Sequence, residues 1–332
     1  MFGRYVPASG QPNKRAYRRV AAGDPFREVR AIVSAADIAF ANLETPVLVE
    51  PKEFSTTDWL TFRAEESDLV ALRSAGFDVL NLANNHAADF GLGAAARTRE
   101  SVLRAGFGAV GAGKDETMAA APQIVTVKGM RIAFLAFTTW TNGNVPIGPG
   151  GAVSFVEEQD LVRRAVPAVL AARAVHRADF VVLSLHWGNE YRPHPEDLQR
   201  KQARFLSDCG ADVILGSHPH VWQDVEIRNG RVIAYSLGNF LFDSETLARR
   251  ETAVLRVVLE GTGKGHRVAS ASLVPVLLGR SDHVPRPATG TSGAALTARL
   301  GALAPGCSVG GMIQKDLTQA RLEGPTGAGG RP

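Results

Sequence analysis

Cysteine is nearly absent from this chain of 332 residues, which contains only Cys209 and Cys307. Two cysteines cannot build the network of disulfides that holds small secreted domains together. No Cys-x-x-Cys pair is present, so the sequence gives no sign of a zinc site made of thiolates. The fold must therefore rest on a hydrophobic core, for which 45% hydrophobic and 21% charged residues are an ordinary composition.

Long hydrophobic runs are also missing. No segment approaches the ~18 consecutive apolar residues of a membrane-spanning helix, and residues 1–5 lead into polar and basic residues rather than into the apolar stretch of a signal peptide. If Met1 is the true start, we therefore expect a cytoplasmic protein. Much of the net charge of +4 lies in one basic cluster. We interpret this cluster as the solvated start of a helix rather than as a contact for an anionic polymer. No nucleic-acid-binding motif accompanies it. The cluster consists of Lys14, Arg15, Arg18 and Arg19.

The chain does contain a regular alternation of short β-rich segments and amphipathic segments of helical period. Such alternation is typical of an α/β protein. Two hairpins, with turns at Lys128-Gly129 and Asn229-Gly230, add antiparallel strands and therefore favour mixed sheets. The expected strands are 37–41, 77–82, 107–110, 124–127, 131–137, 179–185, 212–215, 225–228 and 232–235, and the expected helices are 24–35, 65–75, 93–105, 157–176 and 195–209.

Polar side chains follow four of the expected strands at the point where each strand ends. Ligands gather at the carboxyl ends of strands in open α/β sheets, and carboxylate, amide and imidazole groups are ligands for divalent metals. One such residue alone is usually just a hydrogen-bonded side chain, but four groups in register predict a shared metal site. In chain order, the groups are Asn42 and Glu44; Asn85, His86 and Asp89; His186 and Glu190; and His218 and His220.

Five motifs carry a resemblance to a known family. They are NLETP (42–46), LANNHAADFG (82–91), HWGNEY (186–191), GSHPHVWQ (216–223) and YSLGNFLFD (235–243). In this order they resemble the CapA family of poly-γ-glutamate capsule-synthesis proteins, within the calcineurin-like metallophosphatase superfamily. The resemblance covers about residues 1–287, and it implies a four-layer α/β/β/α sandwich with mixed sheets and a two-metal site at the strand ends.

The resemblance also implies roles for individual residues. Glu44 would bridge two divalent ions of manganese, zinc or iron. Asn85, His186 and His218 would complete the sphere of one ion, and His220 would reach the other, because Pro219 stiffens the turn between the two histidines. His86 would act as a proton donor or stabilise charge, with Asp89 either orienting it or capping the helix near Gly93. Contacts with the metal ligands or the substrate are expected for Arg4, Asn42, Glu190 and Asn239, although Asn239 could equally shape a turn.

The sequence departs from the family pattern at its start. Family members open with a strand that ends in Gly-Asp, in a form like GDxMxxR, whereas this chain begins at the methionine of that motif, with Arg4 fitting the arginine. The first strand and its metal-binding Asp are thus missing, so we expect one metal site to be retained, the second to be incomplete, and a sheet edge to be exposed. Either the start is assigned too late in a longer protein that also carries a membrane anchor or signal, or the chain is a paralogue that binds one metal or none. We favour the first because the other motifs show no decay.

Two functions follow from the resemblance. The first is a metal-dependent enzyme of poly-γ-glutamate or related envelope-polymer synthesis, which hydrolyses or transfers a phosphoester or amide-like bond with the help of His86. The second is a non-catalytic accessory protein that binds an anionic polymer or a membrane synthase complex. By resemblance the protein is associated with the cell envelope. We expect residues 1–290 to form the metallophosphatase-like domain and residues 291–332, rich in Gly, Ala and Pro, to form a partly disordered extension.

Overall fold

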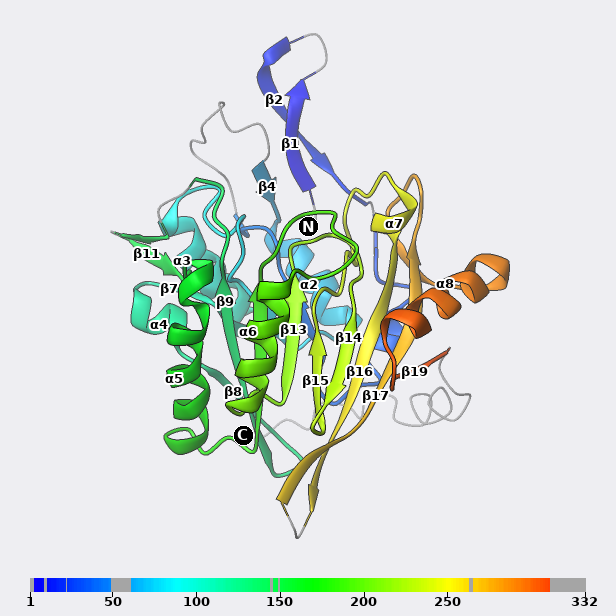
Figure 1. The fold of residues 1–332 in the computed structure, drawn as a ribbon. Helices are drawn as coiled ribbons and strands as arrows, with labels where there is room; N and C mark the ends of the chain where they lie inside the picture. Colours follow the sequence, from blue (N-terminus) through cyan, green and yellow to red (C-terminus); the bar gives the residue numbers. More distant parts are fainter. Residues whose placement is uncertain are drawn as a thin grey trace, which may run out of the picture.

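The computed structural model describes residues 3–8, 11–21, 23–48, 61–143, 146–148, 150–262 and 265–310, and for residues 3–18 and 262 it describes the backbone alone. Strands and helices alternate through most of this length, and the strands form several separate sheets (Figure 1). The expected mixed α/β fold is confirmed.

A six-stranded mixed sheet forms one half of the molecule. Its central strand β12 (Phe180–His186) is buried at every position and reads as the continuous apolar run typical of parallel strands covered on both faces. The two expected hairpins close the edges of this sheet, and their turn residues have positive φ, as type I′ turns require: 49° and 79° at Lys128-Gly129, 51° and 70° at Asn229-Gly230. In spatial order the strands are β14 (Val225–Arg228), β15 (Arg231–Ala234), β13 (Val213–Ser217), β12, β9 (Met130–Thr138) and β8 (Gln123–Val127).

Two helices cover the outer face of this sheet, α5 (Leu161–Ala174) and α6 (Asp197–Asp208) (Figure 1). A hydrophobic cluster joins Leu161 and Leu206 on the helices to Leu183 and Leu185 on β12. The sequence starts α6 with a reciprocal capping box between Glu196 and Gln199.

The opposite layer consists of two smaller sheets. One is parallel and contains β3 (Phe40–Asn42), β5 (Val79–Asn81) and β6 (Gly108–Val110). The other contains β16 (Glu251–Thr262), β17 (Gly265–Leu278), β18 (Pro285–Pro287) and β19 (Ser308–Val309). The main hydrophobic core lies between these sheets and the six-stranded sheet and continues under α1 (Arg30–Val33), α2 (Glu66–Ala75) and α3 (Leu92–Arg104). The layers thus follow the expected α/β/β/α order.

A gap separates the two smaller sheets. The strands that border it, β3 and β16, each pair on one side only among the described strands. Between them lies a cavity of about 460 Å³, walled by Ile32 and Leu72 on the helical side and by Phe134 and Val182 on the six-stranded sheet.

Most of the expected elements are present, with two corrections. The helix expected over 24–35 is reduced to the single turn of α1, because turns occupy residues 25–29. The basic cluster does not start a helix: its residues lie in β2 (Gln11–Arg19), which pairs with β1 (Gly3–Ala8), and β1 in turn pairs with β4 (Thr61–Arg63). The remaining elements are β7 (Ala112–Gly113), α4 (Glu116–Ala120), β10 (Ile147–Gly148), β11 (Gly151–Val153), a 3-10 turn (Glu158–Asp160) and α7 (Leu247–Arg250).

The C-terminal part is described as far as residue 310. Helix α8 (Gly290–Leu303) buries Leu296 and Leu300 in the main core. Residues 311–332, which include the tail expected to be disordered, lie outside the described residues, and the division at residue 290 stays a prediction. Within the described ranges, no helix has the length and apolar character that crossing a membrane requires.

Candidate metal centre

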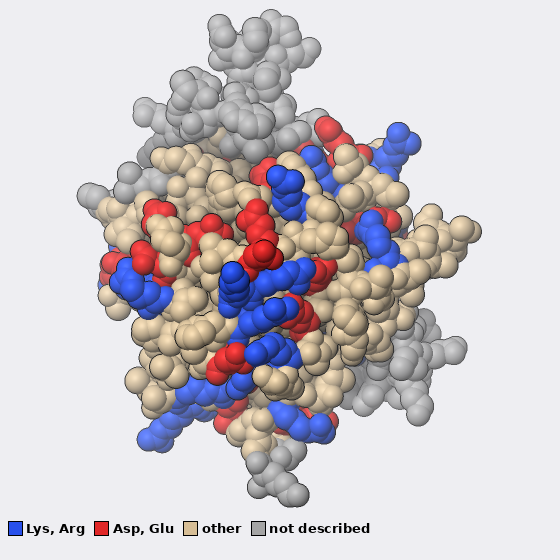
Figure 2. Space-filling model, viewed as in Figure 1, with Lys and Arg blue, Asp and Glu red and all other residues tan. Residues whose placement is uncertain are grey.

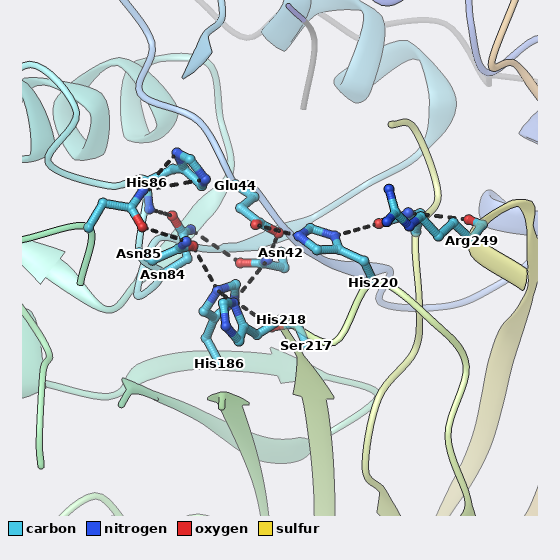
Figure 3. Close-up of polar contacts among 12 residues, drawn as sticks. Asn42, Glu44, Asn84, Asn85, His86, His186, Ser217, His218, His220 and Arg249 are labelled. Carbon is cyan, nitrogen blue, oxygen red and sulfur yellow. Dashed lines mark hydrogen bonds and ion pairs between the residues drawn. The ribbon is translucent and has the colours of Figure 1, made fainter. Parts of the chain in front are cut away.

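The polar residues expected at the strand ends come together at one end of the sheets. The end of β12 and the segments after β3, β5 and β13 deliver five side chains to a single region, and all five are buried (Figure 3): Glu44, Asn85, His186, His218 and His220. They divide into two groups, which we call the Asn85–His186–His218 cluster and the Glu44–His220 pair.

In the Asn85–His186–His218 cluster, two polar atoms lie close to one ring nitrogen. The Nε2 atom of His186 lies 2.9 Å from Oδ1 of Asn85 and 3.1 Å from Nδ1 of His218. Atoms that bind one ion at about 2.1 Å and at right angles to each other lie about 3 Å apart, so these separations fit one coordination sphere. The Asn85 amide nitrogen donates to Oδ1 of Asn142 at 2.9 Å, which turns its oxygen toward His186.

Both histidines of this cluster are neutral near pH 7. Burial, reinforced by the neighbouring histidines, lowers the pKa of His186 well below its ordinary value and lowers the pKa of His218 to about 3. A metal ion binds the neutral imidazole, so this environment prepares both rings for coordination. The other nitrogen of His186, Nδ1, lies 2.9 Å from Oγ of Ser217, a contact that fixes the orientation of the ring.

The turn that carries His218 and His220 is conformationally unusual. Their φ angles are 99° and 58°, in the left-handed region that non-glycine residues rarely occupy and that costs about 1–3 kcal/mol per residue. The two ring centroids are 6.2 Å apart, with His218 facing His186 and His220 facing Glu44. The expected separation of the two histidines across Pro219 is therefore present.

The Glu44–His220 pair brings a buried carboxylate oxygen close to a ring nitrogen. His220 Nδ1 lies 2.8 Å from Oδ1 of Asn239, whose amide nitrogen donates to Oγ of Ser244 and to the carbonyl of Arg249. Asn239 can therefore accept from Nδ1, and in the neutral ring Nε2 then carries a lone pair. That atom lies 3.6 Å from Oε1 of Glu44, a buried carboxylate oxygen with no hydrogen-bond partner in the described part of the chain. Two facing acceptors with no proton between them form a setting that a cation would satisfy.

Asn42 links the two groups. Its amide nitrogen donates to Oε2 of Glu44 at 3.2 Å and lies 3.5 Å from Nδ1 of His186. Its oxygen accepts from the amides of Asn81 at 3.0 Å and Asn84 at 3.3 Å. These contacts hold the half-buried Asn42 beside both groups.

His86 lies beside these groups but contacts a different set of partners. Its Nδ1 is 2.8 Å from Oδ2 of Asp89, which also accepts from the backbone amide of Phe62. Burial would lower the pKa of His86, but the charges of Asp89 and Glu44 outweigh burial and raise it above 6.5. The ring of Phe62 stacks on His86 at 3.7 Å between centroids. Asp89 thus orients His86, and it does not cap α3, whose N-cap, Gly91, has no side-chain bond.

The remaining expected residues lie at the margin. Glu190 is exposed and close enough for its charge to raise the pKa of His86. Arg4 is paired through its backbone position with Phe62 of β4, and its side chain lies outside the described residues.

Sequence reasoning missed residues after a fifth strand. Strand β9 runs parallel to β12, and the segment that follows it supplies Trp140, whose ring stacks on His218 at 5.0 Å, and Asn142, which contacts both Asn85 and His86. The strand-end rule that found the other four groups would have found this one too, had the second strand of the hairpin been recognised as part of the parallel core. Tyr191 and Arg249, beside His220, were also missed.

The fit to a metal ion is good for one group and partial for the other. No set of three or more His, Cys, Asp and Glu side chains, among those that the structure describes, is grouped closely enough to hold an ion. The Asn85–His186–His218 cluster reaches three ligands only because an amide oxygen counts as one. The Glu44–His220 pair supplies two.

The sequence is similar to proteins of capsule synthesis. Residues 1–244 match the family described as bacterial capsule synthesis protein PGA_cap. The PGA biosynthesis protein CapA of Bacillus subtilis is 34% identical over 271 residues, which span 80% of this chain and 67% of that protein. The capsule biosynthesis protein CapA of Bacillus anthracis is 32% identical over 294 residues, spanning 87% and 67%. A Mycobacterium tuberculosis protein, named as a probable polyglutamine synthesis accessory protein, is 27% identical over 77% of this chain and 70% of its own length.

Solved structures show weaker similarity. A hypothetical protein from Thermus thermophilus aligns with a TM-score of 0.46 and 17% identity over 76% of this chain and 92% of its own. A phosphatase from Mycoplasma pneumoniae aligns with a TM-score of 0.41 and 12% identity, over 76% and 89%. At these scores the alignments add nothing to the fold described above.

Proposed function

Because the chain belongs to the bacterial capsule synthesis protein family PGA_cap, we propose that it acts on poly-γ-glutamate, or on a related anionic polymer of the cell envelope, as a metal-dependent hydrolase or transferase. The observation that carries this proposal is the convergence of Asn85, His186 and His218 at 2.9–3.1 Å next to the unpartnered carboxylate oxygen of Glu44.

Each group of the site has a distinct task in this proposal. Asn85, His186 and His218 would hold one divalent cation of manganese, zinc or iron, and Glu44 with His220 would contribute to a second. When bound, such cations supply positive charge that polarises an oxygen of the scissile group. Asn42 and Asn239 keep Glu44 and His220 in position through the hydrogen bonds described above.

His86 is the candidate proton donor. Its raised pKa favours the protonated ring, and its Nδ1 lies against Asp89, so we assign the proton available for transfer to Nε2. The amide nitrogen of Asn142 lies 3.2 Å from Nδ1 and 3.5 Å from Nε2 of His86, so Asn142 lies against the ring. A proton passed from Nε2 to the leaving group would neutralise the charge that develops when the bond breaks.

An accessory role is the second candidate. The name of the Mycobacterium tuberculosis relative and the incomplete ligand set of the Glu44–His220 pair favour it. In that case the chain would bind the polymer or a membrane synthase complex without turnover. Association with the cell envelope is part of both proposals.

Metal content is the first measurement. Protein dialysed against Mn²⁺ and then against buffer should retain at least one ion per chain by elemental mass spectrometry. His186→Ala should lose the ion of the Asn85–His186–His218 cluster, while His194→Ala, which changes a side chain 62% exposed, should not. A wild-type chain that retains no metal would overturn the proposal.

Turnover is the second measurement. Manganese-loaded protein should shorten poly-γ-glutamate, followed by size-exclusion chromatography. His86→Ala should lose roughly 100-fold or more of this activity with its metal content unchanged, since general acid catalysis contributes about 10²–10⁴-fold. Polymer binding without shortening, unaffected by chelation, would favour the accessory role instead.

A further inference from the structure

Arginine side chains on the surface of this protein are mostly paired. Over the face that carries α6, Lys and Arg are interleaved with Asp and Glu (Figure 2). Arg204 contacts Glu226 at 2.9 Å, and Arg228 contacts Asp208. Such arginines are neutralised by their neighbours, and this face presents no broad basic patch to an anionic polymer.

Arg249, on α7, is different. Its guanidinium has no carboxylate or hydrogen-bond acceptor as a partner among the described residues, and its contact is with the ring of Tyr191, whose centroid lies 3.7 Å from Cζ. Arg249 is only half-buried, so its donors remain accessible. A guanidinium over an aromatic ring is attracted by the negative face of that ring, and it keeps its in-plane N–H groups free for an anion.

Tyr191 ties this arginine to the metal centre. The Tyr191 ring lies 6.1 Å from that of His220, at an angle of 28°, and its backbone amide donates to the carbonyl of Pro219 at 2.8 Å. Its φ of 63° is a further left-handed conformation beside the two strained histidines. Burial, and then the neighbouring Glu190, raises the pKa of Tyr191 to about 12, so the ring stays neutral. Tyr191, in the segment after β12, is therefore hydrogen-bonded to the turn that positions His218 and His220.

We propose that Arg249, held over Tyr191, binds a carboxylate of the substrate and thereby selects polyanionic chains. This inference rests on the proposed function and names the residues that recognise its substrate. Figure 3 shows His86 and Arg249 at opposite ends of the site, with Glu44 and His220 between them. A chain bound across the site thus has a carboxylate at Arg249, its scissile bond near Glu44 and His220, and its leaving group at His86.

Binding of a defined oligomer tests the proposal without requiring turnover. The probe is a fluorescently labelled γ-linked glutamate hexamer, and its dissociation constant for manganese-loaded full-length protein is measured by fluorescence anisotropy. Arg249→Gln should weaken binding roughly 10- to 100-fold, as expected for the loss of charged hydrogen bonds. Arg249→Lys should recover only part of this loss, since lysine keeps the charge without the planar fork. The matched control is Arg163→Gln on α5, whose side chain is 78% exposed and paired with Asp160; it should bind as the wild type does.

Two further measurements distinguish recognition of the carboxylate from a general disturbance of the fold. A hexamer with its carboxylates converted to amides should bind wild type and Arg249→Gln equally. Tyr191→Leu should weaken binding of the acidic hexamer, and Tyr191→Phe, which keeps the ring, should restore most of it.

The outcomes distinguish this inference from the proposed function. Equal affinity of wild type and Arg249→Gln for the acidic hexamer would overturn the role of Arg249, even if the enzyme shortens the polymer. Failure of the wild type to bind the hexamer would also overturn it. Loss of binding in Arg249→Gln alone would support it, even if no turnover is found.

Discussion

The two layers of sheet contribute unequally to the candidate metal centre. The six-stranded sheet is continuous, and its adjacent parallel strands β12 and β13 deliver His186 and His218 in register, with His186 opposite Ser217. The facing layer is interrupted between β3 and β16, and Glu44, which follows β3, lines the cavity in that gap. The side chains of the continuous sheet meet a third ligand atom at coordination distance, whereas Glu44 and His220 remain 3.6 Å apart.

This difference shows how a site depends on the sheet beneath it. Paired strands fix the positions of their terminal residues through hydrogen bonds on both sides, so we expect the Asn85–His186–His218 cluster to be preformed. A strand with one free edge fixes its terminal residue less completely. We therefore expect the first cation to bind to the Asn85–His186–His218 cluster and the Glu44–His220 pair to bind more weakly.

The largest effect is expected from breaking the continuous sheet at Gly216. A Cβ there would lie 1.8 Å from the carbonyl oxygen of Tyr235, so Gly216→Ala forces β13 and β15 apart. We expect a loss of about 3 kcal/mol or more in the free energy of unfolding, measured by urea titration. Gly301→Ala on α8, where a Cβ meets no atom within 4 Å, should instead be neutral or stabilising by about 0.5–1 kcal/mol. Equal effects of the two substitutions would contradict the packing described here.

A smaller effect, on metal affinity, should distinguish the Asn85–His186–His218 cluster from the Glu44–His220 pair. Ser217→Ala removes the contact to His186, and Asn239→Leu removes the acceptor for His220. Loss of such supporting contacts lowers metal affinity about 10- to 100-fold. In calorimetric titration with Mn²⁺, Ser217→Ala should weaken the first binding event and Asn239→Leu the second, and Asn239→Asp, which keeps an acceptor, should recover the second. If Asn239→Leu weakened both events equally, the two halves would not be independent.

The smallest effect, on the free energy of unfolding, is expected at Glu226, away from the candidate metal centre. Burial would raise the pKa of Glu226, but hydrogen bonds and charge from Arg204, with Tyr235 and Arg200, hold it below 4.5. A depressed folded-state pKa stabilises the protein above the unfolded-state pKa, and this stabilisation is lost as the pH falls through the folded-state value. Glu226→Gln should therefore cost about 1–2 kcal/mol at neutral pH and less in acid, measured by thermal unfolding at pH 7 and pH 3. Metal binding should be unchanged, and a cost that does not shrink in acid would contradict this reading.

The sequence predicts the continuous sheet better than the interrupted one. The run FVVLSLH is apolar enough to be recognised as a buried strand that ends in His186, and Lys128-Gly129 and Asn229-Gly230 determine their hairpins locally. Residues 24–35 have a helical period, yet they form only one turn of helix, because tertiary packing overrides a weak local preference.

Parts of the site could not be read from local pattern. The contact between Arg249 and Tyr191 joins residues far apart in the chain, and no spacing rule connects a four-residue helix to the turn after β12. Nor could the sequence decide between the two roles considered for Asp89. That choice depends on where Phe62 and His86 lie, because their nitrogens are the donors that its carboxylate accepts.

Trp140 gives the metal centre an optical signal of its own. Of the tryptophans that the structure describes, Trp187 and Trp222 are buried in the core, whereas Trp140 is 40% exposed and stacks on the imidazole of His218. Indole fluorescence responds to the electronic state of a ring in contact with it, so occupation of His218 should change the emission of this tryptophan. Metal binding could then be followed in real time, in unlabelled protein, by tryptophan fluorescence.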